Sequence, residues 1–168
     1  DDEFIQKITQ YLDFENIIDY FIFINLIQAE DNIGKNMYLF RYDEEYPISF
    51  SVWDLDLTFG NKNSIWTSNS SDELILRNLL FDRLYLLDVD NYREKIANKW
   101  DDIIQNINFN DYFQILENNK SSLINSKAIN RNNIRWGIDS NFETEVDYLK
   151  TWIENRMIFL DSYMDENY

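Results

Sequence analysis

The sequence predicts an α+β domain that is mostly helical and carries one β-hairpin in its N-terminal third. Two runs rich in β-branched and aromatic residues, Met37–Tyr42 and Ile48–Trp53, flank a short polar stretch that holds the only proline, which is typical of a hairpin. From Asp72 onward, leucine and isoleucine recur at helical spacing. With 168 residues, the chain has the length of a single domain, and we expect residues 1–168 to form one.

The hairpin, at about residues 37–53, is the most informative element of the sequence. Pairing Tyr42 with Ile48 would place Asn36 opposite Asp54, so that an amide and a carboxylate meet at the open end of the ladder. The other even-numbered pairs of this register are apolar or aromatic. Because a lone hairpin is marginally stable, we expect this even-numbered face to pack against helices.

A buried helix is expected before the hairpin and a helical bundle after it. The first helix should cover Phe14–Gln28 with Asp13 as its N-cap, since apolar residues surround it nearly completely. Four later segments show helical periodicity: Asp72–Leu87, Asn91–Ile107, Asp111–Lys127 and Phe142–Met164. The last helix should turn Glu145, Lys150 and Arg156 toward water, and Asn130–Ser140 should be the connection before it.

Composition excludes several classes of function. The chain has no cysteine and no histidine, so thiolate sites and histidine bases cannot occur, and any catalysis must use carboxylates, amides, hydroxyls, Lys or Arg. The net charge of −16 repels phosphate backbones, which argues against nucleic-acid binding and favours a basic protein partner. No run of 18 apolar residues occurs, so no membrane span is expected.

Four polar residues around the hairpin suggest a site for a hard cation such as Mg²⁺. Asp31 and Asn36 precede the first strand, whereas Asp54 and Asp56 alternate after the second and would share one face of an extended backbone. The order of catalytic parts in protein kinases matches this arrangement: an Asp, an Asn five residues further on, a strand pair and then an Asp before a glycine. The histidine before the first Asp and an Asp-Phe-Gly tripeptide are absent.

Other interpretations of these residues stay open. Aspartate and asparagine near turns are often solvated or cap a helix, although the large apolar neighbours of Asp54 and Asp56 make that reading less favourable. Asp31 and Asp54 could also form a glycosidase carboxylate pair, with Trp53 or Trp66 as a sugar platform. Elsewhere, Arg135 and Trp136 could bind an anion or stack on a base, but core packing and a salt bridge are favoured.

With these residues, the sequence resembles the spore coat protein H (CotH) kinase family from about Asp13 to Met164. The block Trp53-Asp54-Leu55-Asp56-Leu57-Thr58-Phe59-Gly60 carries the resemblance most specifically. Further support comes from Asp19-Tyr20-Phe21, from Asp31 with Asn36-Met37-Tyr38-Leu39-Phe40, and from Leu149–Arg156. The family consists of atypical bacterial protein kinases that are secreted or associated with the cell surface or spore coat.

The resemblance implies a kinase-like fold that transfers phosphate from ATP, with Mg²⁺ or Mn²⁺, to serine in a basic, serine-rich protein. Asp31 would be catalytic, Asn36 and Asp54 would hold the metal and nucleotide, and Asp56 would be a further metal ligand or a support. Because few residues precede Asp31, we expect the C-terminal lobe of the kinase without its N-terminal nucleotide-binding lobe, and little or no activity of this fragment alone. The alternative is a non-catalytic scaffold of the same family; a carbohydrate-active domain comes third.

Overall fold

The computed structural model describes residues 1–61, 70–138 and 141–168, and it confirms a mostly helical α+β fold with one antiparallel hairpin. Its α-helices are α1 (Asp2–Tyr11), α2 (Phe14–Ile27), α3 (Leu79–Leu87), α4 (Tyr92–Asn106), α5 (Phe109–Asn125), α6 (Ala128–Trp136) and α7 (Phe142–Asn167). Strands β1 (Met37–Phe40) and β2 (Ser49–Val52) form the hairpin, and two 3₁₀ turns cover Glu30–Ile33 (η1) and Val89–Asn91 (η2).

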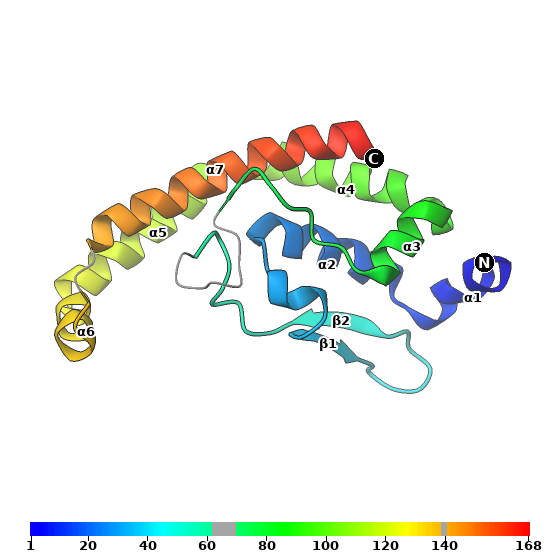
Figure 1. Cartoon of the computed structure of the whole chain (residues 1–168), viewed down its shortest axis with the longest axis horizontal. Coiled ribbons are helices and arrows are strands. Elements are labelled where there is room, and N and C mark those ends of the chain that lie inside the picture. Colours follow the sequence, from blue (N-terminus) through cyan, green and yellow to red (C-terminus); the bar gives the residue numbers. More distant parts are fainter. Residues whose placement is uncertain (62–69, 139–140) are drawn as a thin grey trace.

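Helix α2 is the centre of the molecule, between the hairpin and the helices α4 and α7 (Figure 1). The helix begins as expected with Asp13 as its N-cap, because the Asp13 carboxylate accepts the N–H of Asn16 at 3.2 Å. Nine of its residues are buried, so the helix lies inside the core as its sequence predicts. The core continues through buried aromatic rings on neighbouring helices, such as Phe81, Tyr92 and Trp100.

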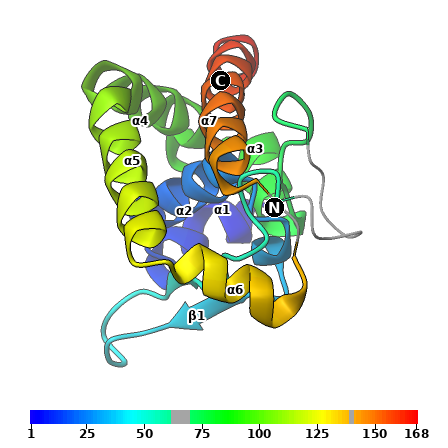
Figure 2. The same ribbon diagram turned by 90° about the vertical axis from the view of Figure 1, so that its left-hand side faces the viewer.

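Helices α5 and α6 and the first half of α7 form an arm that extends beyond this core (Figures 1 and 2). Neither α5 nor α6 contains a buried residue. The expected connection at Asn130–Ser140 is wrong for its first part, because residues up to Trp136 belong to helix α6. Core packing is also wrong for Trp136, whose side chain is 65% exposed. Across the described residues, no helix has the length and apolar character that a bilayer crossing requires.

Arg156 on α7 is fully buried, so its expected position on the wet side is wrong. Its guanidinium donates to the carbonyls of Asn25 at 2.9 Å, Glu73 at 2.7 Å and Leu74 at 3.0 Å. Burial lowers the Arg156 pKa to about 10, against a smaller raising effect of Glu30. The Glu73 and Leu74 carbonyls belong to a non-helical segment before α3, which explains why that helix begins at Leu79 and not at Asp72.

The hairpin register differs by one residue from the expected pairing. Phe40 pairs with Ser49, and Tyr38 pairs with Ser51. Ile48 is not available to Tyr42, because it forms a parallel bridge with Leu12 at the junction of α1 and α2. A one-residue shift turns every side chain of one strand to the other face.

The even-numbered side chains of β1 are therefore exposed and do not face the helices as expected. Tyr38 is 56% and Phe40 52% exposed. Phe50 of β2 is buried against α2, where its ring contacts Tyr20 edge-on at 5.5 Å between centroids. Only half of the expected face, the part on β2, anchors the hairpin to the core.

Candidate functional site

The candidate site is built on the η1 turn, which follows the C-terminus of α2. The Tyr20 hydroxyl reaches from α2 and donates to the carbonyl of Asn32 at 2.6 Å. Burial raises the pKa of Tyr20 to about 12. The buried Asn32 side chain accepts the N–H of Trp53 and donates to its carbonyl, both at 3.2 Å. One buried amide therefore joins the turn that carries Asp31 to the loop that carries Asp54.

Asp31 lies at the surface of this turn and forms an ion pair with Lys35. The Lys35 ammonium donates to Oδ2 of Asp31 at 2.8 Å, and the Asp31 side chain is 30% exposed. This hydrogen bond and the charge of Asp31 raise the Lys35 pKa, with smaller raising effects from Asp54 and Asp56. Asp31 thus binds the Lys35 ammonium directly, and the charges of Asp54 and Asp56 act on the same group without a contact.

Asn36 closes the same turn. Its backbone N–H donates to the carbonyl of Asp31 at 2.9 Å, and the residue is only 8% exposed. Within residues 1–61, 70–138 and 141–168, no hydrogen bond engages its side-chain amide. A largely buried amide without a protein partner is suited to bind a ligand or water.

Asp54 and Asp56 follow β2 in an irregular loop and are both exposed. Asp54 has φ 58°, so the chain leaves the extended conformation there, and Asp54 does not stand opposite Asn36 in the ladder. The expected common face on an extended backbone, among buried apolar neighbours, is therefore wrong for both aspartates. The carbonyl of Asp56 accepts the side-chain amide of Asn61 at 2.7 Å.

The end of this loop is fixed to the helices. The N–H of Phe59 donates to the carbonyl of Ile27 at 2.8 Å, and its ring meets Trp152 of α7 edge-on at 5.9 Å. The Tyr148 hydroxyl donates to the carbonyl of Gly60 at 3.1 Å. The two exposed aspartates consequently lie on a loop that is held at both ends, by Asn32 at Trp53 and by α7 at Gly60.

The donor set fits a metal that arrives together with phosphate better than one held by protein alone. In the part of the chain that the structure describes, no three acidic side chains are grouped closely enough to hold a metal ion. Mg²⁺ in phosphate-transferring sites commonly takes one or two carboxylates and completes its shell with phosphate oxygens and water. Asn36, Asp54 and Asp56 carry side-chain oxygens of the kind that such a metal binds.

An aromatic pair borders the site. Tyr38 and Trp53 contact each other edge-on, with ring centroids 6.1 Å apart, and are 56% and 62% exposed. Trp66, the other expected sugar platform, lies outside the described residues. Sequence reasoning did not assign Lys35 or Asn32 to the site. The spacing of four residues between Asp31 and Lys35 was the available signal, whereas nothing in the sequence marks Asn32.

The model of one protein family, described as CotH kinase protein, matches residues 1–160. Since this match spans nearly the whole chain, the chain belongs to the CotH kinase family, as the Trp-Asp-Leu-Asp block indicates. No curated protein and no solved structure matches the sequence. Family membership supports a kinase-related function for the chain.

Proposed function

We propose that this chain is the catalytic, C-terminal lobe of a CotH-like protein kinase that transfers the γ-phosphate of ATP to serine in a basic protein. The observation that carries the proposal is the ion pair of Asp31 with Lys35, whose ammonium also feels the negative charges of Asp54 and Asp56. These carboxylates, together with Asn36, stand on two loops joined by Asn32. Positioned carboxylates and an amide are the protein groups that phosphoryl transfer requires.

Asp31 is the proposed acceptor of the serine hydroxyl proton. Lys35 occupies its Oδ2, whereas Oδ1 receives no hydrogen bond from the described residues, so one oxygen can orient the hydroxyl. Asn36 and Asp54 are the proposed ligands of Mg²⁺ or Mn²⁺, and Asp56 supports them. When bound, the metal neutralises negative charge on the ATP phosphates.

Tyr38 and Trp53 offer ATP an apolar surface next to these polar groups. Each directly neighbours the site in the chain, since Tyr38 comes two residues after Asn36 and Trp53 immediately precedes Asp54. Exposed aromatic rings stack on nucleobases with a favourable free energy of about 1–3 kcal/mol per base. The phosphates of a nucleotide stacked there would reach the Asn36 and Asp54 oxygens.

We further propose that the nucleotide-binding lobe is supplied from outside residues 1–168. Protein kinases cover the phosphates with a Gly-rich loop, but this chain contains only three glycines, Gly34, Gly60 and Gly137. The chain alone should then transfer phosphate slowly or not at all. A scaffold that engages a basic partner is the second candidate, favoured by the absence of a three-carboxylate metal group from the described residues.

Thermal unfolding with added ligands tests the proposal, because a ligand that binds only the folded state raises the melting temperature. We expect a small rise with MgCl₂ or MnCl₂, a larger rise with ATP and Mg²⁺, and none with oligosaccharides. Asp54→Ala should abolish the rise and Asp31→Ala should keep it. Asp165→Ala, an exposed change on α7, is the matched control.

Three results would contradict the phosphotransfer proposal. An absent shift with ATP and Mg²⁺ combined with binding of a basic protein would indicate the scaffold. A shift with oligosaccharides would indicate a carbohydrate-active domain. Loss of the metal shift in both Asp31→Ala and Asp54→Ala would show that the proposed division of roles is wrong.

A further inference from the structure

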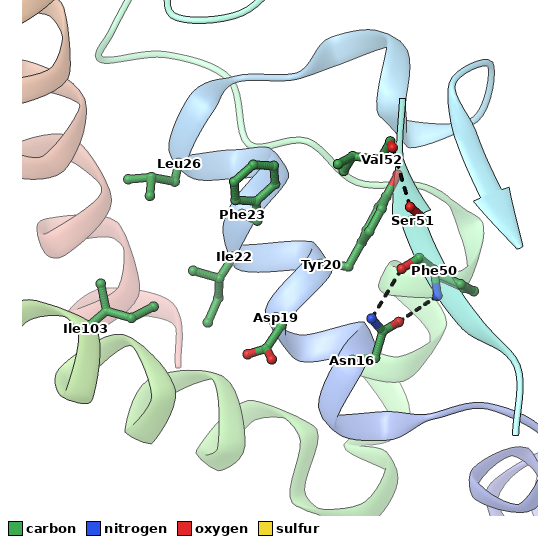
Figure 3. A pocket seen from close by; sticks show the side chains of 10 residues that line it. All are labelled: Asn16, Asp19, Tyr20, Ile22, Phe23, Leu26, Phe50, Ser51, Val52 and Ile103. Atoms are coloured by element: carbon green, nitrogen blue, oxygen red, sulfur yellow. Dashed lines mark hydrogen bonds between the residues drawn. The ribbon is translucent and has the colours of Figure 1, made fainter. Parts of the chain in front are cut away.

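The two strands of the hairpin differ in whether the backbone groups on their outer edges have hydrogen-bond partners. The outer edge of β2 faces α2, where the Asn16 side chain accepts the N–H of Phe50 at 2.6 Å and donates to its carbonyl at 3.2 Å (Figure 3). Phe50 therefore directs its backbone groups away from β1, which makes Leu39–Phe50 a non-hydrogen-bonded pair of the ladder. It follows that Leu39 directs its own N–H and C=O away from β2, to the outer edge of β1.

That outer edge is open. Within the described residues β1 pairs only with β2, and the N–H and C=O of Leu39 form no hydrogen bond. Figure 1 shows β1 on the side of the hairpin remote from α2. The Leu39 side chain is 57% exposed, and neither a proline nor a lysine interrupts the strand. An exposed apolar edge without such protection is a template for another strand.

Both ends of this edge are acidic. Before the start of β1 lies Asp31 with its ion-pair partner Lys35, whose ammonium the charges of Asp54 and Asp56 also reach. At its far end the turn contains Asp43, Glu44 and Glu45, all exposed. Arg41, which directly follows β1, donates to the carbonyls of Tyr46 at 2.7 Å and Glu44 at 2.6 Å and thus folds back onto the turn. A strand on this edge would meet negative charge at each end.

We propose that the outer edge of β1 binds an extended, basic segment of the acceptor protein by strand addition. This inference rests on the proposed function and adds how the substrate reaches the site, because a strand paired with β1 runs directly past Asn36 toward Asp31. Backbone hydrogen bonds to Met37, Leu39 and Arg41 supply affinity, as in other cases of β-augmentation. The acidic turn selects segments that carry Lys or Arg.

The geometry fixes the spacing within such a segment. Seven positions separate Asn36 from Asp43 in the sequence, and a strand rises about 3.3 Å per residue. A segment with its serine next to Asn36 thus places residues about seven to nine positions away beside the Asp43–Glu45 turn. Basic residues are expected at that distance from the phosphorylated serine, on the side that the strand direction brings to the turn.

Binding of a synthetic peptide tests strand addition separately from phosphotransfer. The probe is a fluorescent peptide of roughly twelve residues, with one serine, alternating valine and threonine, and arginines at one end. We expect Leu39→Pro to weaken binding about tenfold or more, since it removes the outward N–H and bends the exposed edge. Leu39→Val keeps that N–H and should bind as the wild type does. Glu44→Gln with Glu45→Gln should weaken binding and reduce its salt dependence.

Backbone N-methylation of the peptide gives a second measurement that leaves the protein unchanged. Methyl groups on alternate amides of one edge should abolish binding, whereas methyl groups on the other edge should not. Equal binding by both methylated peptides, or equal binding by a peptide with glutamates in place of the arginines, would overturn the inference. The thermal shift with ATP and Mg²⁺ is measured separately. If that shift is absent while the peptide still binds to β1, the phosphotransfer proposal alone has failed.

Discussion

At Gly60 the backbone has φ 66°, and a Cβ would stand 2.3 Å from Nε1 of Trp152 and 2.9 Å from the Tyr148 hydroxyl. The first property favours glycine because other residues are strained at positive φ. The second excludes a side chain because the indole and the phenol are themselves held by contacts with the loop. The loop with Asp54 and Asp56 therefore meets α7 at a position where only glycine fits.

We expect Gly60→Ala to lower the free energy of unfolding by about 2–4 kcal/mol, since strain and overpacking add. The measurement is urea unfolding followed by circular dichroism. Gly34→Ala is the matched control, because it has no atom within 4 Å of the added Cβ. Gly137→Ala separates the two causes, since it has φ 63° but open space. If Gly60→Ala lowers the free energy of unfolding no more than Gly137→Ala does, close packing against Trp152 does not contribute to the effect.

The sequence allowed the residue types of the site to be predicted, but not how their side chains are arranged and what they contact. The acids and the amide stand out because of their spacing around the hairpin, and Asp31 and Asn36 do share one turn. Their neighbours were not predictable, because Asn32 and Lys35 act through contacts that only the folded turn creates. Arg156 shows the same limit, since its position on α7 says nothing about free carbonyls before α3.

At the scale of elements, periodicity was a good guide to helices and a poor guide to strand register. The long apolar patterns of α2, α4 and α7 gave helices with boundaries close to those expected. The register failed because Ile48 has a partner, Leu12, far outside the hairpin. Helix α6 was missed because it is short and mostly polar, and none of its few apolar residues is buried.

The Arg156 guanidinium joins three elements, and its substitution should test this link. Arg156→Lys keeps the charge but loses the planar fork that reaches the Asn25, Glu73 and Leu74 carbonyls. We expect a loss of about 2–3 kcal/mol in the free energy of unfolding, because buried carbonyls are left without donors. The exposed Arg135→Lys on α6 should change it by less than about 0.5 kcal/mol. Equal effects of the two changes would contradict the link.

The whole molecule should lose stability in alkali, because several buried tyrosines resist ionisation. Burial raises the pKa of Tyr20 and of Tyr168 to about 12, and it also raises that of Tyr92. A raised pKa means that the folded state holds its proton longer than the unfolded state. The stabilisation is complete below about pH 10 and is lost as pH rises through the folded pKa values. Arg156, whose pKa burial lowers to about 10, acts in the opposite direction above that pH.

We expect the melting temperature to fall steeply between about pH 10 and pH 12, with a smaller slope for Tyr20→Phe. Phenylalanine removes the ionising hydroxyl along with the hydrogen bond to Asn32, so its baseline stability falls while its pH dependence weakens. Tyr42→Phe, at a residue that is 85% exposed, should leave the slope unchanged. Identical slopes for Tyr20→Phe and the wild type would contradict the assignment.

The contact of Gly60 with Trp152 and Tyr148 also has a consequence for biosynthesis. A ribosome releases the aspartate loop long before it has translated α7, so the nascent loop lacks its second anchor. Until α7 emerges from the exit tunnel, the loop has only its contacts with Asn32 and with the Ile27 carbonyl and lacks those with Trp152 and Tyr148. The loop should therefore reach its final conformation late in translation, after the arm helices have been made.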